Sequence, residues 1–311
     1  MSTAASRGEL PIARKTLTPD ETLAEARYLL KQGFRSILLL TGEHERLTGV
    51  QFLEDRIRLL ASEVPSLAVE VQVWSEEEYR RLAAAGCDAV VIYQETYHPE
   101  TYSKVHIAGR KRHFEWRLLG PERAARAGMR RVGIGALLGL HEDWRYEALA
   151  TAAHARFLMK RYWRTQVTVS VPRIRPSASG YQPKDQISDD ELVQLVCALR
   201  LLLPDAGLVI SAREAPALRD GLFRVGITHT SAGSHAGPVA TTSPRRRRSS
   251  SRLLTCDRRV RWPRACVNSA ASQYGETGGR CFQPPSSCSP GPRVLTRSLP
   301  PNHNPRSALG R

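Results

Sequence analysis

The stretch AAAGCDAVVIYQETYH, residues 83–98, decides the fold. Its alanines are typical of the end of a helix, and Gly86 is a helix stop. The apolar run of residues 89–94 then predicts a buried strand. Polar residues begin at Gln94 and continue to His98. This order of helix end, glycine, strand and polar segment is the repeating unit of a sheet whose strands are all parallel.

The same unit recurs along the chain. ARAGMRRVGI repeats the order of helix, glycine and strand, and three helices begin with capping boxes at Thr18, Ser75 and Ser188, each followed by Glu three residues later. Runs rich in Val, Ile and Leu predict seven strands, over residues 36–40, 67–73, 89–94, 131–139, 166–171, 207–211 and 224–230.

A helix over about residues 20–32 precedes the first predicted strand. A complete (β/α)8 barrel opens with a strand, and seven strands are one too few. The pattern therefore predicts an α/β fold, a (β/α)8 TIM-type barrel that lacks its first strand.

The charge of the chain is concentrated at its end. Residues 236–311 contain 14 Arg and only two acids, Asp257 and Glu276, so they carry +12 of the net charge of +16. They contain ten Pro and eleven Ser, and too few of the remaining residues are apolar to form a core. We therefore predict two parts, a barrel over 1–235 and a disordered, basic Arg/Ser/Pro-rich tail over 236–311, which would bind nucleic acid only nonspecifically.

Several classes of protein are excluded. No stretch approaches the ~20 apolar residues of a membrane span, so the expected location is cytoplasmic, with no membrane partner. The chain has no G-x-S-x-G elbow, P-loop or G-x-G-x-x-G fingerprint. Cys87 and Cys197 lie among apolar residues and are expected in the core, and the four tail cysteines lack metal-ligand spacing, so no metal ligand is assigned.

Polar residues or glycines follow every predicted strand. They include acids in TGEH (41–44) and YQETYH (93–98) and cations in PRIRP (172–176) and SARE (211–214). Each has a structural alternative: a helix cap for Glu43, a surface cation for Arg173, an ion-pair partner for Glu95. Because the carboxyl ends of barrel strands converge, the set favours a site for a zwitterionic or phosphorylated small molecule.

The blocks GFRSILLLTGEHE, VIYQETYHPETY, GIGALLGL, VSVPRIRP and SAREAP, in this order, resemble the radical S-adenosylmethionine tyrosine lyases of thiamine biosynthesis, the 2-iminoacetate synthases (ThiH type). The resemblance covers about residues 10–234. It implies a (β/α)8 barrel with S-adenosylmethionine and a 4Fe-4S cluster. It also implies radical cleavage of the Cα–Cβ bond of tyrosine to 2-iminoacetate (dehydroglycine) and p-cresol, with thiazole synthase as partner.

The resemblance also implies roles for individual residues. Gly42 and Glu43 would bind the methionyl amine of the cofactor, because an ammonium group needs a carboxylate and a close backbone. Glu95 would hold the ribose hydroxyls. Arg117 would pair with the cofactor carboxylate as a planar fork.

Two further residues take roles from the same resemblance. Gly135 would let adenine lie against the backbone. Arg213 would anchor the carboxylate of tyrosine, which makes it the catalytic-site residue of this set.

The sequence departs from the family in one respect. The family holds its cluster with three cysteines in a C-x-x-x-C-x-x-C loop after the first strand, and no cysteine precedes Cys87 here. Thiolates are the ligands of such clusters. We therefore expect these 311 residues to be inactive in the radical reaction.

Codons can be chosen for MSTAAS (residues 1–6) and for Gly237–Thr242 so that a one-base shift of the reading frame encodes residues that match the family. This favours an N-terminally truncated chain with a frameshifted C-terminus over a true fusion to a basic tail. Two alternatives to a 2-iminoacetate synthase stay open: the tyrosine lyase of hydrogenase maturation, and a non-catalytic binding protein with a basic tail.

Overall fold

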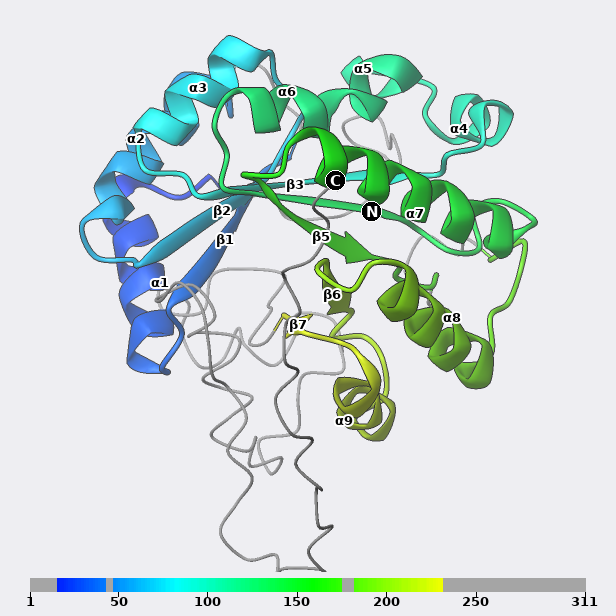
Figure 1. The fold of residues 1–311 in the computed structure, drawn as a ribbon. Helices are drawn as coiled ribbons and strands as arrows, with labels where there is room; N and C mark the ends of the chain where they lie inside the picture. The colour runs from blue at the N-terminus through cyan, green and yellow to red at the C-terminus, as the bar shows by residue number, and fades with distance from the viewer. Residues whose placement is uncertain (1–15, 43–46, 175–181, 232–311) are drawn as a thin grey trace, which may run out of the picture. The chain divides into compact units, whose positions relative to one another are not determined.

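The computed structural model describes residues 16–42, 47–174 and 182–231 (Figure 1). Glu43, the predicted tail 236–311 and both segments of the frameshift interpretation lie outside the described residues. Within them no helix is long and apolar enough to cross a membrane.

Within the described residues, seven parallel strands form one sheet in the order in which they follow along the chain. A doubly wound sheet would reverse its strand order partway, whereas a barrel sheet does not. The order therefore confirms the predicted barrel type with seven strands. They are β1 (Ser36–Leu40), β2 (Ser66–Glu70), β3 (Ala89–Glu95), β4 (Arg131–Ala136), β5 (Gln166–Ser170), β6 (Gly207–Ile210) and β7 (His229–Thr230).

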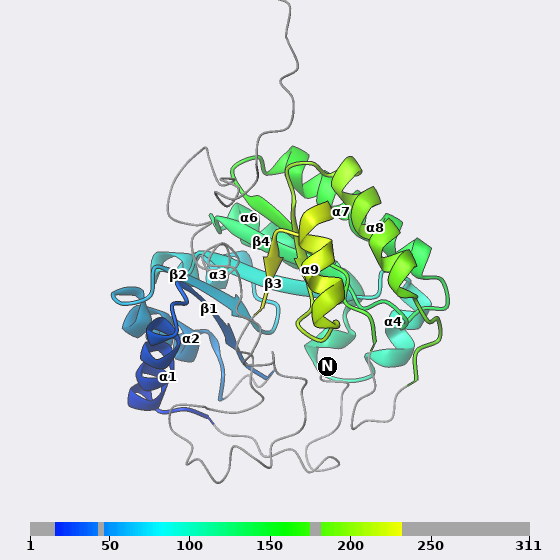
Figure 2. The same ribbon diagram turned by 90° about the horizontal axis from the view of Figure 1, so that it is seen from below.

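Helices connect the strands and cover one face of the sheet, from α1 beside β1 to α9 beside β7 (Figures 1 and 2). The helices are α1 (Pro19–Lys31), α2 (Val50–Ala61), α3 (Glu76–Ala84), α4 (Pro99–Val105), the 3-10 turn η1 (Arg110–Arg112), α5 (Phe114–Leu118), α6 (Gly120–Arg126), α7 (Trp144–Arg161), α8 (Asp189–Leu202) and α9 (Pro216–Val225).

The three predicted capping boxes are present. Thr18, Ser75 and Ser188 each accept a hydrogen bond from the backbone of the glutamate three residues on, and that glutamate bonds back to the cap. These reciprocal bonds satisfy amides that the first turn of a helix leaves without partners. The helix expected over 20–32 is α1, so its start is one residue earlier than predicted.

One predicted strand is shorter than expected. The run expected as a strand over 224–230 contains the end of α9, which stops at Gly226 with a φ of 152°, and only His229 and Thr230 pair with β6. Val225 is exposed at the end of the helix and Ile227 is buried just beyond it, so the apolar run spans a helix end and a turn before the chain enters the sheet. Cys87 is buried as predicted, but Cys197 is only half-buried.

The two faces of the sheet differ in their residues. On β3, Val90 and Ile92 are buried in the apolar core beneath the helices, whereas Val91, Tyr93 and Glu95 alternate with them and are half-buried. This alternation follows from the two-residue period of a strand. The inner face therefore carries Tyr93, and β3 delivers Glu95 at its carboxyl end.

Candidate functional site

Glu95 is the last residue of β3 and has an unusual backbone conformation. Its φ is 72°, which makes it the only non-glycine residue with positive φ in the described ranges. The pairing of β3 with β4 shifts between Tyr93 and Glu95, and the Glu95 carbonyl accepts a 2.7 Å hydrogen bond from the Leu137 amide. Such a conformation costs about 1–3 kcal/mol and clusters at functional sites.

Two cations surround the Glu95 carboxylate. Lys111 Nζ lies 2.7 Å from Oε1, and a terminal nitrogen of Arg117 lies 3.9 Å from the same oxygen. Burial alone would raise the pKa of Glu95, but the charges of Lys111 and Arg117 outweigh it and hold the pKa below its usual range. Glu95 is therefore an anion at neutral pH and can accept hydrogen bonds from a ligand.

Glu70, at the end of β2, lies on the same inner face. Burial raises the pKa of Glu70, and the negative charge of Glu95 adds to this effect. Register pairs place Glu70 beside Val91, one pleat before Tyr93. Tyr93 is also kept neutral, because burial raises its pKa. The inner face thus combines one firmly ionised acid with groups that resist ionisation.

Arg117 reaches the site from α5. It is buried, and its Nε donates a 2.7 Å hydrogen bond to the carbonyl of Tyr93. A shallow crevice lies beside it, lined by Val73, Arg110, Lys111, Trp116 and Arg117. The indole nitrogen of Trp116 is buried without a hydrogen-bond partner. Because buried polar groups normally have partners, this unsatisfied donor beside two cations is an unexplained polar group of the crevice.

Gly42 lies just past the end of β1. Its φ does not require glycine, and a Cβ placed there would meet no described atom within 4 Å. Its carbonyl accepts a 2.8 Å hydrogen bond from the Thr48 hydroxyl, while the hydroxyl of Thr41 is buried without a partner. Neither packing nor backbone strain among the described residues explains the glycine, so the open space suits a ligand. The role predicted for Glu43 lies outside the described residues.

Gly135, on β4, has a clear structural reason to be glycine. A Cβ there would lie 2.0 Å from the carbonyl oxygen of Ser170 and 3.0 Å from the ring of Tyr93. The glycine therefore permits close packing of β4 against β5. Its predicted contact with adenine stays a prediction.

At the carboxyl end of β6, neighbouring residues have opposite environments. Arg213 is exposed, and its side chain makes no hydrogen bond or ion pair within the described part of the chain. Glu214 is buried, and its carboxylate accepts hydrogen bonds from Nε and from a terminal nitrogen of Arg173. Arg173 also contacts Asp189 at 2.8 Å and the Ile187 carbonyl at 2.8 Å. Arg173 is thus a structural residue, while Arg213 is available to a ligand.

The sequence did not indicate several residues of this site. Tyr93 could have been found, because it precedes Glu95 by two residues and so shares its face. Glu70 could have been found from its position at the end of the neighbouring strand. Lys111 comes from a basic loop, RKR, that carries no periodic signal. Its partner could be identified only from the structure.

The described residues do not fit an iron–sulfur cluster. Cys87 precedes β3 at the amino-terminal edge of the sheet, where its thiol contacts the carbonyls of Leu67 and Ala89. Cys197 lies within α8. No group of three His, Cys, Asp or Glu side chains in the described ranges could hold a metal ion. The described residues therefore do not supply the thiolates that an iron–sulfur cluster needs.

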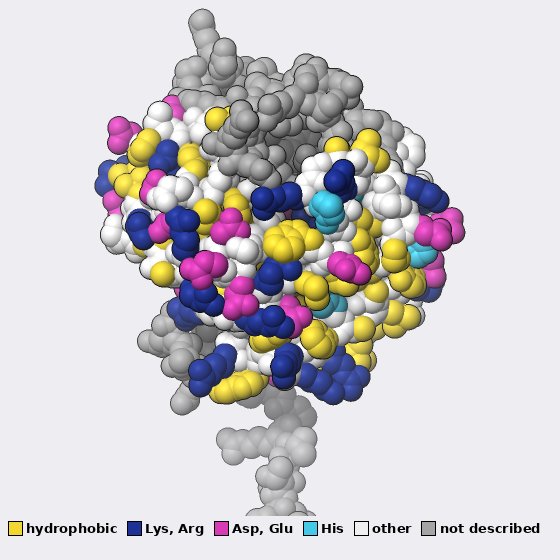
Figure 3. All heavy atoms as spheres, turned by 90° about the horizontal axis from the view of Figure 1, so that it is seen from above, with side chains coloured by type: hydrophobic (Ala, Val, Ile, Leu, Met, Phe, Trp, Pro, Cys, Tyr) yellow, Lys and Arg dark blue, Asp and Glu magenta, His cyan; other side chains and the backbone are white. Residues whose placement is uncertain are grey.

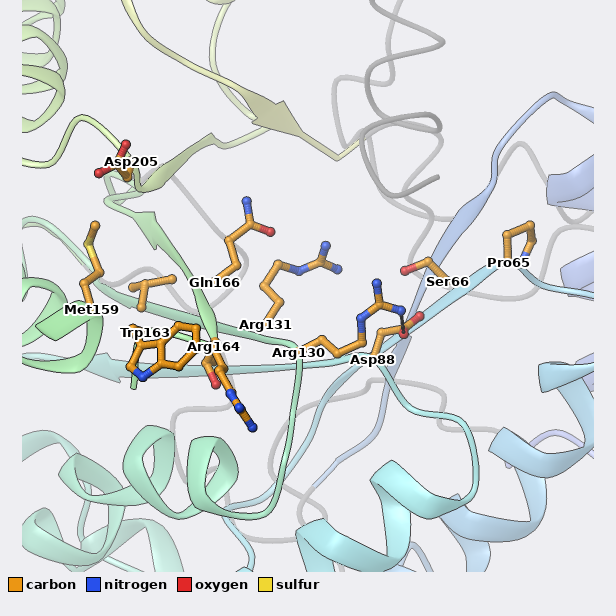
Figure 4. A pocket seen from close by; sticks show the side chains of 12 residues that line it. Pro65, Ser66, Asp88, Arg130, Arg131, Met159, Trp163, Arg164, Gln166 and Asp205 are labelled. Carbon is orange, nitrogen blue, oxygen red and sulfur yellow. Dashed lines mark hydrogen bonds and ion pairs between the residues drawn. The ribbon is translucent and has the colours of Figure 1, made fainter. Parts of the chain in front are cut away.

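A second cavity lies at the opposite edge of the sheet. It has a volume of about 570 Å³, and its lining includes Ser66, Arg131 and Gln166 at the amino ends of β2, β4 and β5 (Figure 4). Arg130 is paired with Asp88 there at 3.3 Å. In barrels this edge contributes stability and the carboxyl edge carries the chemistry, so we assign function to the Glu95 edge.

The surface bears on the nucleic-acid alternative. On the face seen in Figure 3, basic side chains are mixed with acidic and apolar ones and do not gather into a stripe. Nucleic-acid binding by a folded face needs clustered cations. This face of the described residues lacks that arrangement.

Comparisons with known proteins show which families the chain is similar to. Residues 4–153 match the model of the Radical SAM superfamily, and residues 170–261 match the Biotin and Thiamin Synthesis associated domain. The second match continues beyond the predicted boundary at residue 235. The chain is 40% identical over 227 residues to 2-iminoacetate synthase of Escherichia coli K12 and 39% identical to that of Salmonella typhimurium LT2.

These matches cover 73% of this chain and 60% of each relative, so the chain spans less than two thirds of their length. Among solved structures, the FeFe-hydrogenase maturase HydG from Carboxydothermus hydrogenoformans aligns with a TM-score of 0.69 and 37% identity, covering 73% of this chain and 54% of that one. Methylornithine synthase (PylB), at a TM-score of 0.53 and 19% identity, covers 70% and 63% and shares the fold. The matched sequences, with the parallel sheet, place the chain in the radical SAM superfamily, with the 2-iminoacetate synthases among its relatives.

Proposed function

We propose that the carboxyl edge of this sheet binds S-adenosylmethionine and tyrosine for cleavage of the tyrosine Cα–Cβ bond to 2-iminoacetate and p-cresol, a step toward the thiazole of thiamine. The observation that carries the proposal is Glu95. It is a strained, ionised acid at a strand end, with two cations beside its carboxylate. Identity to 2-iminoacetate synthases supports this reaction among those of the superfamily.

The adenosyl cofactor has distinct groups for the residues of this edge. Glu95 accepts hydrogen bonds from the ribose hydroxyls, which a carboxylate can do in bidentate fashion. The open backbone at Gly42, followed by Glu43, receives the methionyl ammonium. Arg117 and the crevice beside it supply positive charge for the cofactor carboxylate.

Arg213 binds the tyrosine carboxylate. Its guanidinium is the cation at the β6 end with no partner in the described residues, whereas Arg173 is fully occupied by Glu214, Asp189 and a carbonyl. A planar fork fixes the orientation of a carboxylate, and orientation decides which substrate hydrogen lies nearest the reacting carbon.

The cluster that supplies the radical in this family needs cysteines that the described residues do not provide. We therefore propose that the 311 residues bind cofactor and substrate without reaction, and that a chain joined to a strand with the C-x-x-x-C-x-x-C loop is active. Thiazole synthase is the proposed consumer of the product.

The test compares the chain alone with that extended chain after anaerobic reconstitution with iron and sulfide. We expect no iron–sulfur absorbance and no p-cresol from the chain alone, and p-cresol from the extended chain.

Lys in place of Arg213 keeps the charge but loses the planar fork, so R213K in the extended chain should abolish p-cresol while uncoupled cofactor cleavage continues. Wild-type p-cresol from R213K would overturn the anchor, and an inactive, fully loaded extended chain would overturn the function.

The hydrogenase-maturation alternative is supported by the alignment with HydG. Both readings include tyrosine as substrate, so the product distinguishes them. 2-Iminoacetate hydrolyses to glyoxylate and ammonia. Detection of glyoxylate as the accumulated product supports the thiamine reaction.

A further inference from the structure

Glu147, on α7, is a buried carboxylate to which neither the sequence nor the comparisons give a role. Its exposed fraction is 0%. Its Oε1 accepts a 2.5 Å hydrogen bond from the hydroxyl of Thr96, and its Oε2 accepts a 2.7 Å bond from the amide of Tyr97. Both oxygens thus bind the two residues that directly follow Glu95.

These contacts continue into the loop after β3. The Thr96 hydroxyl also accepts a 3.1 Å hydrogen bond from the amide of His98, the residue that caps α4. One carboxylate therefore holds the turn from the end of β3 to the start of α4. Because both carboxyl oxygens of one buried side chain are engaged, the attachment fixes both residues of this turn.

A role for Glu147 in its own helix is not supported by its contacts. Asp143 caps α7, accepting from the amides of Arg145 at 2.9 Å and Tyr146 at 3.3 Å. Glu147 comes one turn later and points its carboxylate across to β3. An acid buried only for packing would be replaced by an apolar residue at lower cost, because an ionised group loses its hydration on burial.

The backbone of Glu95 needs such support. A glutamate at a φ of 72° is strained, and the strain persists only when surrounding contacts determine the conformation. The Leu137 amide holds the Glu95 carbonyl on one side, and Glu147 holds the next two residues on the other. Released from Glu147, Glu95 would relax to negative φ, and its carboxylate would leave Lys111.

We propose that Glu147 is a positioning residue that fixes the left-handed conformation of Glu95 and thereby aims the Glu95 carboxylate at the ribose of the adenosyl ligand. The ligand part of this inference rests on the proposed function. The conformational part concerns only the residues of this chain.

The test uses the full chain with Glu147→Ala, Glu147→Gln and Thr96→Val, and calorimetry with S-adenosylhomocysteine as probe. Glu54→Gln is the matched control, because Glu54 is also a buried acid but pairs with Arg58 and Arg81 under the helices. We expect Glu147→Ala to weaken the probe about tenfold, as for supporting residues of other sites. The Gln and Val variants, which keep part of the network, should lose less, and the control should lose nothing.

A double-mutant cycle with Glu95→Gln separates positioning from general weakening. If Glu147 acts through Glu95, Glu147→Ala should have almost no further effect in the Glu95→Gln background. An equal loss in both backgrounds would overturn the inference.

A crystal structure of the Glu147→Ala or Glu147→Gln chain gives a readout that needs no ligand. We expect Glu95 to leave positive φ and to lose its contact with Lys111. Retention of both would overturn the inference, whatever the chain binds. If Glu95→Gln itself leaves probe affinity unchanged, the ribose assignment of the proposed function fails instead, and the crystal structure alone decides the conformational claim.

Discussion

The carboxyl ends of β3 and β6 can be compared residue by residue. At β3, Glu95 faces the inner side of the sheet and Thr96 is tied to the buried Glu147. At β6, Arg213 is exposed and Glu214 is tied to the buried Arg173. The charges are opposite, but in both places one residue is left for a ligand and its neighbour anchors the loop.

The difference between the two ends lies in how firmly the ligand-facing residue is held. Glu95 is strained and ion-paired before any ligand arrives, whereas Arg213 has no described partner. A preorganised acid suits a cofactor that must always bind in one pose. A free arginine retains side-chain entropy until a substrate carboxylate orders it.

The largest effect should come from breaking the buried pair at β6. Glu214→Ala leaves Arg173 buried without its main partner, and uncompensated buried charges cost about 3–5 kcal/mol. Arg213→Ala, one residue away, should change the free energy of unfolding by less than about 0.5 kcal/mol. Urea unfolding of the two variants checks this, and equal losses would show that the two neighbours do not differ as the structure indicates.

The two glycines give the next contrast. Gly135→Ala would place a Cβ 2.0 Å from the Ser170 carbonyl, so we expect a loss of stability of about 3 kcal/mol. Gly42→Ala meets open space and should leave stability nearly unchanged. Thermal unfolding measures the first effect. S-adenosylhomocysteine affinity, which Gly42→Ala should lower, measures whether the space at Gly42 serves a ligand.

The sequence was sufficient for the strand order, six of the seven strands and all three capping boxes, because these depend on local pattern and nearby residues. It was insufficient at α9, where a helical stripe and a short strand form one apolar run. Lys111 and Glu147 could not be assigned, because their partners lie 16 and 51 residues away in the chain and the pairing depends on how the loops fold. The different roles of Arg173 and Arg213 likewise could not be predicted from the sequence, because they depend on the ion pair between Arg173 and Glu214.

The smallest effects concern pH and the two acids of the inner face. The pKa of Glu95 is lowered, so its stabilising contribution is present above about pH 4.5 and is lost as pH falls through the folded-state value. The pKa of Glu70 is raised, so its charge destabilises the folded state at neutral pH and protonation relieves this as pH falls. At pH 7, Glu95→Gln should therefore lower stability and Glu70→Gln should raise it, each by about 1–2 kcal/mol.

The difference in stability between each variant and the wild type should shrink toward pH 3.5, where the carboxyl groups of the wild-type chain are increasingly protonated. Unfolding curves at several pH values provide the measurement. A Glu70→Gln chain that is less stable than wild type at pH 7 would mean that Glu70 is paired more favourably than its surroundings indicate.

The most direct test is to locate where the adenosyl cofactor binds, since the proposed site and the cavity of about 570 Å³ lie at opposite edges of the sheet. Photolabelling of the full chain with 8-azido-S-adenosylmethionine, followed by peptide mass spectrometry, locates it. The account predicts labelled peptides from the carboxyl edge, around residues 93–98 and 131–140, with protection by S-adenosylhomocysteine. Protected labelling of the cavity residues Trp163–Val167 instead would contradict it.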